Sequence, residues 1–102
     1  MQIKVAGTHY EVVREKLLGA AENIYGDANF TIHRIRIDES ITPERAQQTL
    51  IHELLHAIFY EAGYDEQDED VIRRVSTVLY QVLADNDVLS LMEEVAEKAV
   101  IH

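Results

Sequence analysis

The apolar run at residues 50–59, Leu-Ile-His-Glu-Leu-Leu-His-Ala-Ile-Phe, limits the possible folds of this chain more than any other segment. It holds a single formally charged side chain and is long enough to form a helix that packs on a core. Thr42 and Pro43 precede it, and a threonine N-cap followed by proline is a strong signal for the start of a helix. We therefore predict a helix over residues 43–61 that ends near Gly63.

Two histidines lie four residues apart in this predicted helix. His52 and His56 would point from the same helical face, so both imidazoles could bind one metal ion. Glu53 lies at the edge of that face, where it could take a proton from a metal-activated water. This is the HExxH pattern of zinc peptidases, and a metal would also compensate a carboxylate buried among leucines. The alternative is a core helix with two hydrogen-bonded histidines and a glutamate that reaches solvent.

Composition indicates one small folded domain over residues 1–102. The hydrophobic content is 47%, which is typical of a chain with a packed core. Cysteine is absent, so a metal would have to be held by imidazole and carboxylate groups. The N-terminus has no signal-peptide pattern and no run of apolar residues reaches membrane-spanning length. We therefore expect a cytoplasmic protein.

The formal net charge of −10 narrows the range of partners. Such an acidic chain is not expected to bind nucleic acid directly or to associate with anionic membranes. A protein or peptide is the expected partner. Acidic side chains gather at residues 61–70, either as a solvated turn before a helix or as a local field that attracts a metal or a basic peptide.

The residues before the histidine helix predict a small sheet. Residues 3–5 and 9–13 read as a hairpin, and residues 31–37 read as a third strand with Ile35 and Ile37 directed inward. Between them we expect a turn at residues 26–29. The secondary structure of the segment after the hairpin is ambiguous. A short helix is possible there, with Leu17, Leu18, Ala21 and Ile24 on its apolar face.

Two further helices are predicted after Gly63. Asp65 or Asp68 would cap a second helix that reaches about residue 84, and residues 85–87 would separate it from a third helix at residues 88–98. Strands followed by helices indicate an α+β domain. The expected fold is a three-stranded sheet packed on two long helices, with a short C-terminal helix.

A catalytic zinc site needs a third protein ligand. The short connection at Gly63 should make the first two helices antiparallel, which brings Glu69 roughly level with His56. Glu69 also lies three residues before Ile72 on the apolar stripe of the second helix, so it should face the first helix. We therefore rank Glu69 first. The alternatives that remain open are Glu66, Asp65, Glu61 and His33.

The chain resembles the small zincin-like metallopeptidases of phages and prophages, which are related to the ImmA/IrrE group. The resemblance lies in Thr-Leu-Ile-His-Glu-Leu-Leu-His-Ala at residues 49–57 and in the helix that follows. In ImmA/IrrE-type sequences a glutamate ligand begins a stretch of the form Glu-x-x-Ala-x-x-Phe, and that glutamate falls on Glu69. Ile72 and Val75 stand where Ala and Phe are usual. The resemblance implies a minimal zincin-like fold that binds zinc.

These observations predict a zinc-dependent endopeptidase that hydrolyses an intracellular protein. His52, His56 and Glu69 would hold Zn²⁺, and Glu53 would act as general base. An extended substrate segment could add to the sheet edge along residues 31–37. One alternative is a catalytically inactive, zinc-stabilised module that binds a protein. Another is a metal-free helical interaction domain.

Overall fold

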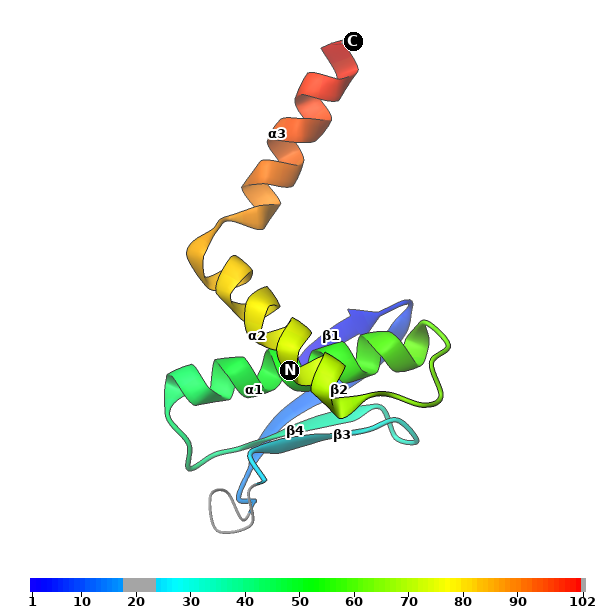
Figure 1. Cartoon of the computed structure of the whole chain (residues 1–102), viewed down its shortest axis with the longest axis vertical. Coiled ribbons are helices and arrows are strands. Elements are labelled where there is room, and N and C mark those ends of the chain that lie inside the picture. The colour runs from blue at the N-terminus through cyan, green and yellow to red at the C-terminus, as the bar shows by residue number, and fades with distance from the viewer. Residues whose placement is uncertain (18–23, 102) are drawn as a thin grey trace.

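The computed structural model describes residues 1–17 and 24–101, and these form an α+β fold. Within these residues the elements in chain order are β1 (Gln2–Val5), β2 (Thr8–Glu15), β3 (Gly26–Asn29), β4 (Arg34–Asp38), α1 (Pro43–Glu61), α2 (Glu69–Asp85) and α3 (Val88–Ile101). The strands form one sheet with α1 across one of its faces, and α2 packs on α1 (Figure 1). The expected short helix between β2 and β3 falls largely at residues 18–23, outside the described residues.

The predicted N-terminal hairpin is present. β1 and β2 pair antiparallel, with Val5 opposite Thr8 at the turn. Ala6 and Gly7 form this turn with φ angles of 48° and 88°, in the left-handed region that glycine adopts without steric cost. β2 then runs to Glu15, two residues beyond the predicted end of the strand.

The sheet has four strands rather than three, in the order β1-β2-β4-β3, with β2 and β4 parallel. The predicted turn at residues 26–29 is wrong, because these residues form β3, antiparallel to β4. Gly-Asp-Ala-Asn has little intrinsic preference for a strand. Pairing with β4 outweighs that preference, and Arg36 of β4 donates from Nε to Oδ1 of Asp27 at 2.9 Å.

β4 begins three residues later than the predicted strand at residues 31–37. Oδ1 of Asn29 accepts hydrogen bonds from the backbone N–H groups of Thr31 and Ile32, at 3.0 and 3.2 Å, and this turns the chain. His33 completes the turn with a φ of 54°. Ile35 and Ile37 are buried, as the alternation predicted.

The helix start signals are confirmed. Oγ1 of Thr42 accepts from the N–H of Arg45 at 3.2 Å, so Thr42 is the N-cap of α1, and Gly63 lies just past its end with a φ of 101°. Asp68, one of the two predicted caps, is the N-cap of α2. Two long helices were expected, but only α1, with 19 residues, is long. α2 has 17 residues, and α3, the C-terminal helix, has 14.

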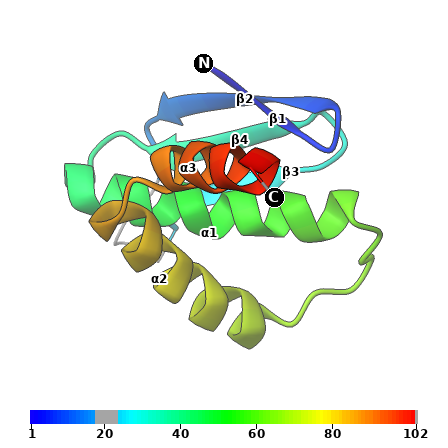
Figure 2. The ribbon, with the colours of Figure 1, turned by 90° about the horizontal axis from the view of Figure 1, so that it is seen from above.

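The core lies between the sheet and α1. Tyr10, Ile35 and Ala57 are fully buried there, and Ile72 of α2 is fully buried as well. Figure 2 shows that α2 runs back along α1 at an angle. α3 projects away from the sheet and from α1, as Figure 1 shows. None of the described helices is long and apolar enough to cross a membrane.

Candidate metal-binding site

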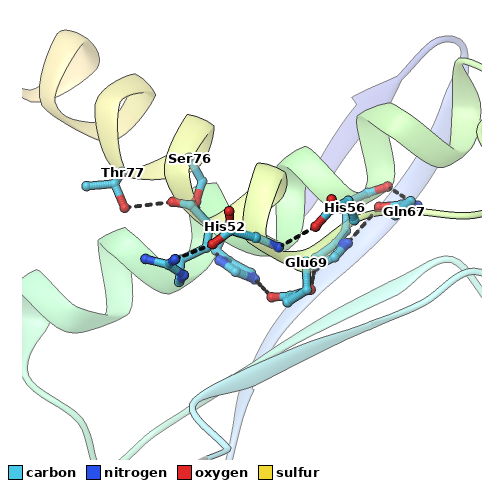
Figure 3. Close-up of polar contacts among 9 residues, drawn as sticks. His52, His56, Gln67, Glu69, Ser76 and Thr77 are labelled. Carbon is cyan, nitrogen blue, oxygen red and sulfur yellow. Dashed lines mark hydrogen bonds and ion pairs between the residues drawn. The ribbon is translucent and has the colours of Figure 1, made fainter.

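The carboxylate of Glu69 lies between the imidazoles of His52 and His56 (Figure 3). Its Oε1 is 2.7 Å from Nε2 of His52, and its Oε2 is 2.8 Å from Nε2 of His56. The two histidines come from α1, and Glu69 is the first residue of α2. The antiparallel packing of these helices therefore brings together the three residues that the sequence proposed as metal ligands.

The site is half open to solvent. The side chains of His52 and His56 are 25% and 17% exposed, whereas that of Glu69 is 65% exposed. The two imidazole rings stand edge to face, with their centroids 5.0 Å apart, as expected for residues four apart on one helical face. A further molecule can therefore approach these three side chains from the open side.

Gln67 determines which nitrogen of His56 carries the proton. Its Nε2 donates to the backbone carbonyl of His56 at 3.2 Å, which leaves its Oε1 to accept from Nδ1–H of His56 at 2.7 Å. Nδ1 is therefore protonated. Nε2, which lies 2.8 Å from Oε2 of Glu69, is then the nitrogen that would bind a metal once it has released its proton.

Ser76 has the same relationship to His52. The Ser76 hydroxyl donates to the carbonyl of Arg73 at 3.1 Å, so its oxygen is free to accept from Nδ1–H of His52, 3.4 Å away. Ser76 is buried on α2, which holds this partner in place. Both histidines thus direct Nε2 toward Glu69, the arrangement that outer partners impose on metal-binding histidines.

Two imidazoles and one carboxylate fit a zinc ion. This ligand set is one of those found in catalytic zinc sites, which keep the fourth position open. One ligand atom from each side chain can be chosen so that all lie within 4.8 Å of one another. Ligand atoms around a tetrahedral zinc lie roughly 3.3 Å apart, so only small side-chain shifts would admit the ion. Within residues 1–17 and 24–101, no other group of three such side chains meets this criterion.

Glu53 is buried beside the site, and burial raises its pKa to about 7. The imidazole of His56 acts in the opposite direction and lowers this pKa, while the charges of Glu69 and Asp27 raise it. A cation bound at the three ligand side chains would favour the ionised form of Glu53. Glu53 is therefore a carboxylate that can accept and release a proton near neutral pH.

A cleft of about 420 Å³ extends from these side chains. Its wall near the proposed ligands includes His52, Glu53 and Glu69, and farther away it includes Tyr25, Arg45 and Tyr80. The residues that line it come from β3, α1, α2 and the segment before β3. The cleft is thus large enough for part of a peptide beside the candidate metal site.

Gly26 allows β3 to come close to α1 at this cleft. A Cβ atom at this position would lie 2.6 Å from the carbonyl oxygen of Arg36 and 2.6 Å from Cγ2 of Thr49. Both distances are too short for a Cβ atom, and the contact with the Arg36 carbonyl could be relieved only by a backbone shift, so the close approach depends on glycine. β3 is the outer strand at this side of the sheet, whereas β4 lies between β2 and β3. The expectation that a substrate adds along residues 31–37 is therefore wrong, because β4 is an inner strand, and β3 is the outer strand there within the described part of the sheet.

The structure places the other proposed ligands elsewhere. Glu61 accepts hydrogen bonds from Tyr10 at 2.7 Å and from Thr8 at 3.1 Å, and burial raises the pKa of the Tyr10 hydroxyl. The ring of His33 packs edge to face on Tyr10, with centroids 5.3 Å apart. Asp65 and Glu66 are exposed and lie outside the group formed by the two histidines and Glu69.

Several residues at the site were not identified from sequence. Ser76 lies two turns after Glu69, and this spacing on one helical face was a signal that could have revealed it. Gln67 lies in the connection between α1 and α2, where no periodicity indicates which side chain turns inward. Tyr25 and Arg45 meet across the cleft only because β3 packs beside α1.

Comparison of this chain with known protein families, characterised proteins and solved structures finds no match.

Proposed function

We propose that this chain is a zinc-dependent endopeptidase that cleaves an intracellular protein. The observation that carries the proposal is the meeting of Glu69 with Nε2 of both histidines beside the buried Glu53. The open side of Glu69 and the adjacent cleft leave room for water and for a peptide. The resemblance of residues 49–57 to the small zincin-like peptidases of phages and prophages supports the same function.

In the proposed reaction the residues of the site have separate roles. His52, His56 and Glu69 would hold Zn²⁺, with Gln67 and Ser76 keeping the imidazoles in the required tautomer. When bound, zinc supplies Lewis acidity that polarises the scissile carbonyl and makes water more acidic. Glu53 accepts the proton of the attacking water and passes it to the nitrogen of the leaving amine, so it ends in its starting state. The cleft holds the peptide in reach of these groups.

Zinc-loaded protein should cleave members of a random peptide library, with the new ends identified by mass spectrometry. Glu53→Gln keeps the shape of the side chain but cannot accept the proton, so it should bind zinc and lose cleavage by at least about 100-fold. Glu66→Gln is a matched control, because Glu66 is exposed and outside the site. Wild-type protein that binds one zinc and cleaves no peptide would refute the proposed activity.

A zinc-stabilised module that binds another protein is the second candidate function. The apolar side chains of α3 favour it, because Leu89, Leu91, Met92 and Val95 are 52–73% exposed. Such surface is often covered by a partner. This candidate predicts that zinc raises the stability of the domain, that no peptide is cleaved, and that Glu53→Gln has no effect on partner binding measured by calorimetry.

A further inference from the structure

The cleft contains a cation, Arg45, that forms no ion pair with a carboxylate of residues 1–17 and 24–101. Arg45 is the only lysine or arginine that lines it among the described residues. It lies seven residues before His52, so the two side chains project from the same face of α1, about 10 Å apart along the helix axis. Arg45 is therefore placed beside a peptide that reaches the proposed metal ligands.

Arg45 is held in position by an aromatic ring rather than by an acid. Its guanidinium carbon lies 5.0 Å from the centroid of the Tyr25 ring. Arg36 pairs with Asp27 and Glu15, and Arg73 and Arg74 pair with Asp70, whereas Arg14 donates to the backbone carbonyls of Asp38 and Ile41. Stacking on a ring restricts the guanidinium without cancelling its charge or using its N–H donors.

This unpaired state is informative because acids outnumber basic residues in the chain by 19 to 9. Within the described residues the guanidinium of Arg45 instead forms no ion pair, and Arg45 lines the cleft together with the polar side chains of Gln48 and Thr77. A planar guanidinium of this kind binds a carboxylate with two parallel hydrogen bonds.

We propose that Arg45 selects peptide substrates carrying an aspartate or glutamate two or three residues from the scissile bond. This inference rests on the proposed endopeptidase function and names its substrate class. An extended peptide rises about 3.3 Å per residue, so the distance of about 10 Å from His52 to Arg45 along α1 corresponds to about three peptide residues. The arginine side chain can reach back toward His52, which makes a position two residues from the scissile bond accessible as well. The net charge of −10 repels acidic peptides at long range, so the preference depends on this local cation.

The test uses zinc-loaded protein and blocked nonapeptides that share one cleavable sequence. A single aspartate is moved through the positions on both sides of the scissile bond, and each peptide has a twin with asparagine at that position. One position two or three residues from the bond should give at least a tenfold higher kcat/KM for aspartate than for asparagine. The preference should shrink as salt is raised from 0.05 to about 0.5 M, because ions screen an exposed charge pair.

Charge reversal then assigns the preference to one side chain. Arg45→Glu should abolish the preference for aspartate and favour lysine at the same position, and Arg45→Lys should retain part of the preference for aspartate. Arg34→Glu is the matched control. Arg34 is an exposed arginine on β4 that does not line this cleft, so its reversal should leave the aspartate-to-asparagine ratio unchanged.

Binding measured without turnover separates this inference from the proposed activity. The same peptides, labelled with a fluorophore, are titrated with zinc-loaded Glu53→Gln protein and followed by fluorescence anisotropy. Cleavage or binding with no aspartate preference overturns the inference and leaves the peptidase proposal intact. Binding that prefers aspartate and depends on Arg45, in a wild type that cleaves nothing, supports the selectivity of Arg45 and refutes the activity.

Discussion

Oε2 of Glu69 lies 2.8 Å from Nε2 of His56, although the two residues belong to different helices, which are joined by a connection of seven residues. The contact exists only when α2 packs on α1. The candidate metal site and the helix pair therefore form together, and an ion at this site would bind the folded state in preference to the unfolded chain.

Loss of Glu69 should weaken metal binding more than any nearby surface change. We expect Glu69→Ala to lower zinc affinity by more than about 100-fold, because it removes a ligand rather than an outer partner, whose loss costs about 10–100-fold. Competition with a chelator of known affinity measures this. Asp70→Ala is the control, since Asp70 is the adjacent acid but pairs with Arg73 and Arg74. Equal losses in both variants would mean that Glu69 is not a ligand.

Zinc should stabilise the wild-type domain against unfolding. A ligand that binds only the folded state adds about 2.7 kcal/mol to the free energy of unfolding when its concentration is 100 times its dissociation constant. Denaturant titrations with zinc and with a chelator measure this difference. In His52→Ala the gain should disappear. A wild-type protein whose free energy of unfolding is the same with zinc and with a chelator would contradict the proposed site.

Gln67 should act on the metal site through His56. We expect Gln67→Ala to lower zinc affinity by about 10–100-fold, because Nδ1 of His56 loses the acceptor that keeps its proton. Gln67→Glu restores an acceptor at this position and should recover most of the affinity. Nitrogen NMR of the imidazole in zinc-free protein should show more of the Nε2–H form in Gln67→Ala than in the wild type, because Oε2 of Glu69 still accepts from Nε2. Unchanged tautomers in the alanine variant would rule out this positioning role.

Glu61 should contribute to stability and not to metal binding. The hydroxyl of the fully buried Tyr10 donates to Oε2 of Glu61 at 2.7 Å. Glu61→Ala leaves this donor without its partner, so the free energy of unfolding should fall by about 1–3 kcal/mol. Zinc affinity should stay within twofold of the wild type. A large loss of affinity in this variant would return Glu61 to the set of ligands.

Asp38 should make stability depend on pH at the acidic end. The backbone N–H of Ser40 donates to Oδ1 of Asp38 at 3.0 Å and lowers the pKa of this carboxyl below its usual value. Its folded pKa is below the unfolded value of about 3.9, so its stabilising effect is complete above that pH and is lost as pH falls through the folded pKa. The stability gap between wild type and Asp38→Asn should be constant from about pH 5 to 7. It should shrink below about pH 4 in urea titrations, and a gap that widens there would contradict this account.

The sequence by itself determined the elements whose signals are local. Thr42 and Pro43 predicted the start of α1, Gly63 predicted its end, and the spacing of His52 and His56 placed both on one face. A cap, a left-handed turn and a four-residue repeat each depend on a few neighbouring residues, so they can be read from sequence. The proposal of Glu69 needed one further step, which the short connection between two helices allowed.

Only the tertiary structure decided the features that join distant segments. β3 has a sequence that favours a turn and becomes a strand because it pairs with β4, and Gly26 lets that strand approach Thr49 of α1. The contacts of Gln67 with His56 and of Arg45 with Tyr25 likewise join separate segments. Such contacts are set by the packing of complete elements, whose energies outweigh local preference, and no short stretch of sequence contains that information.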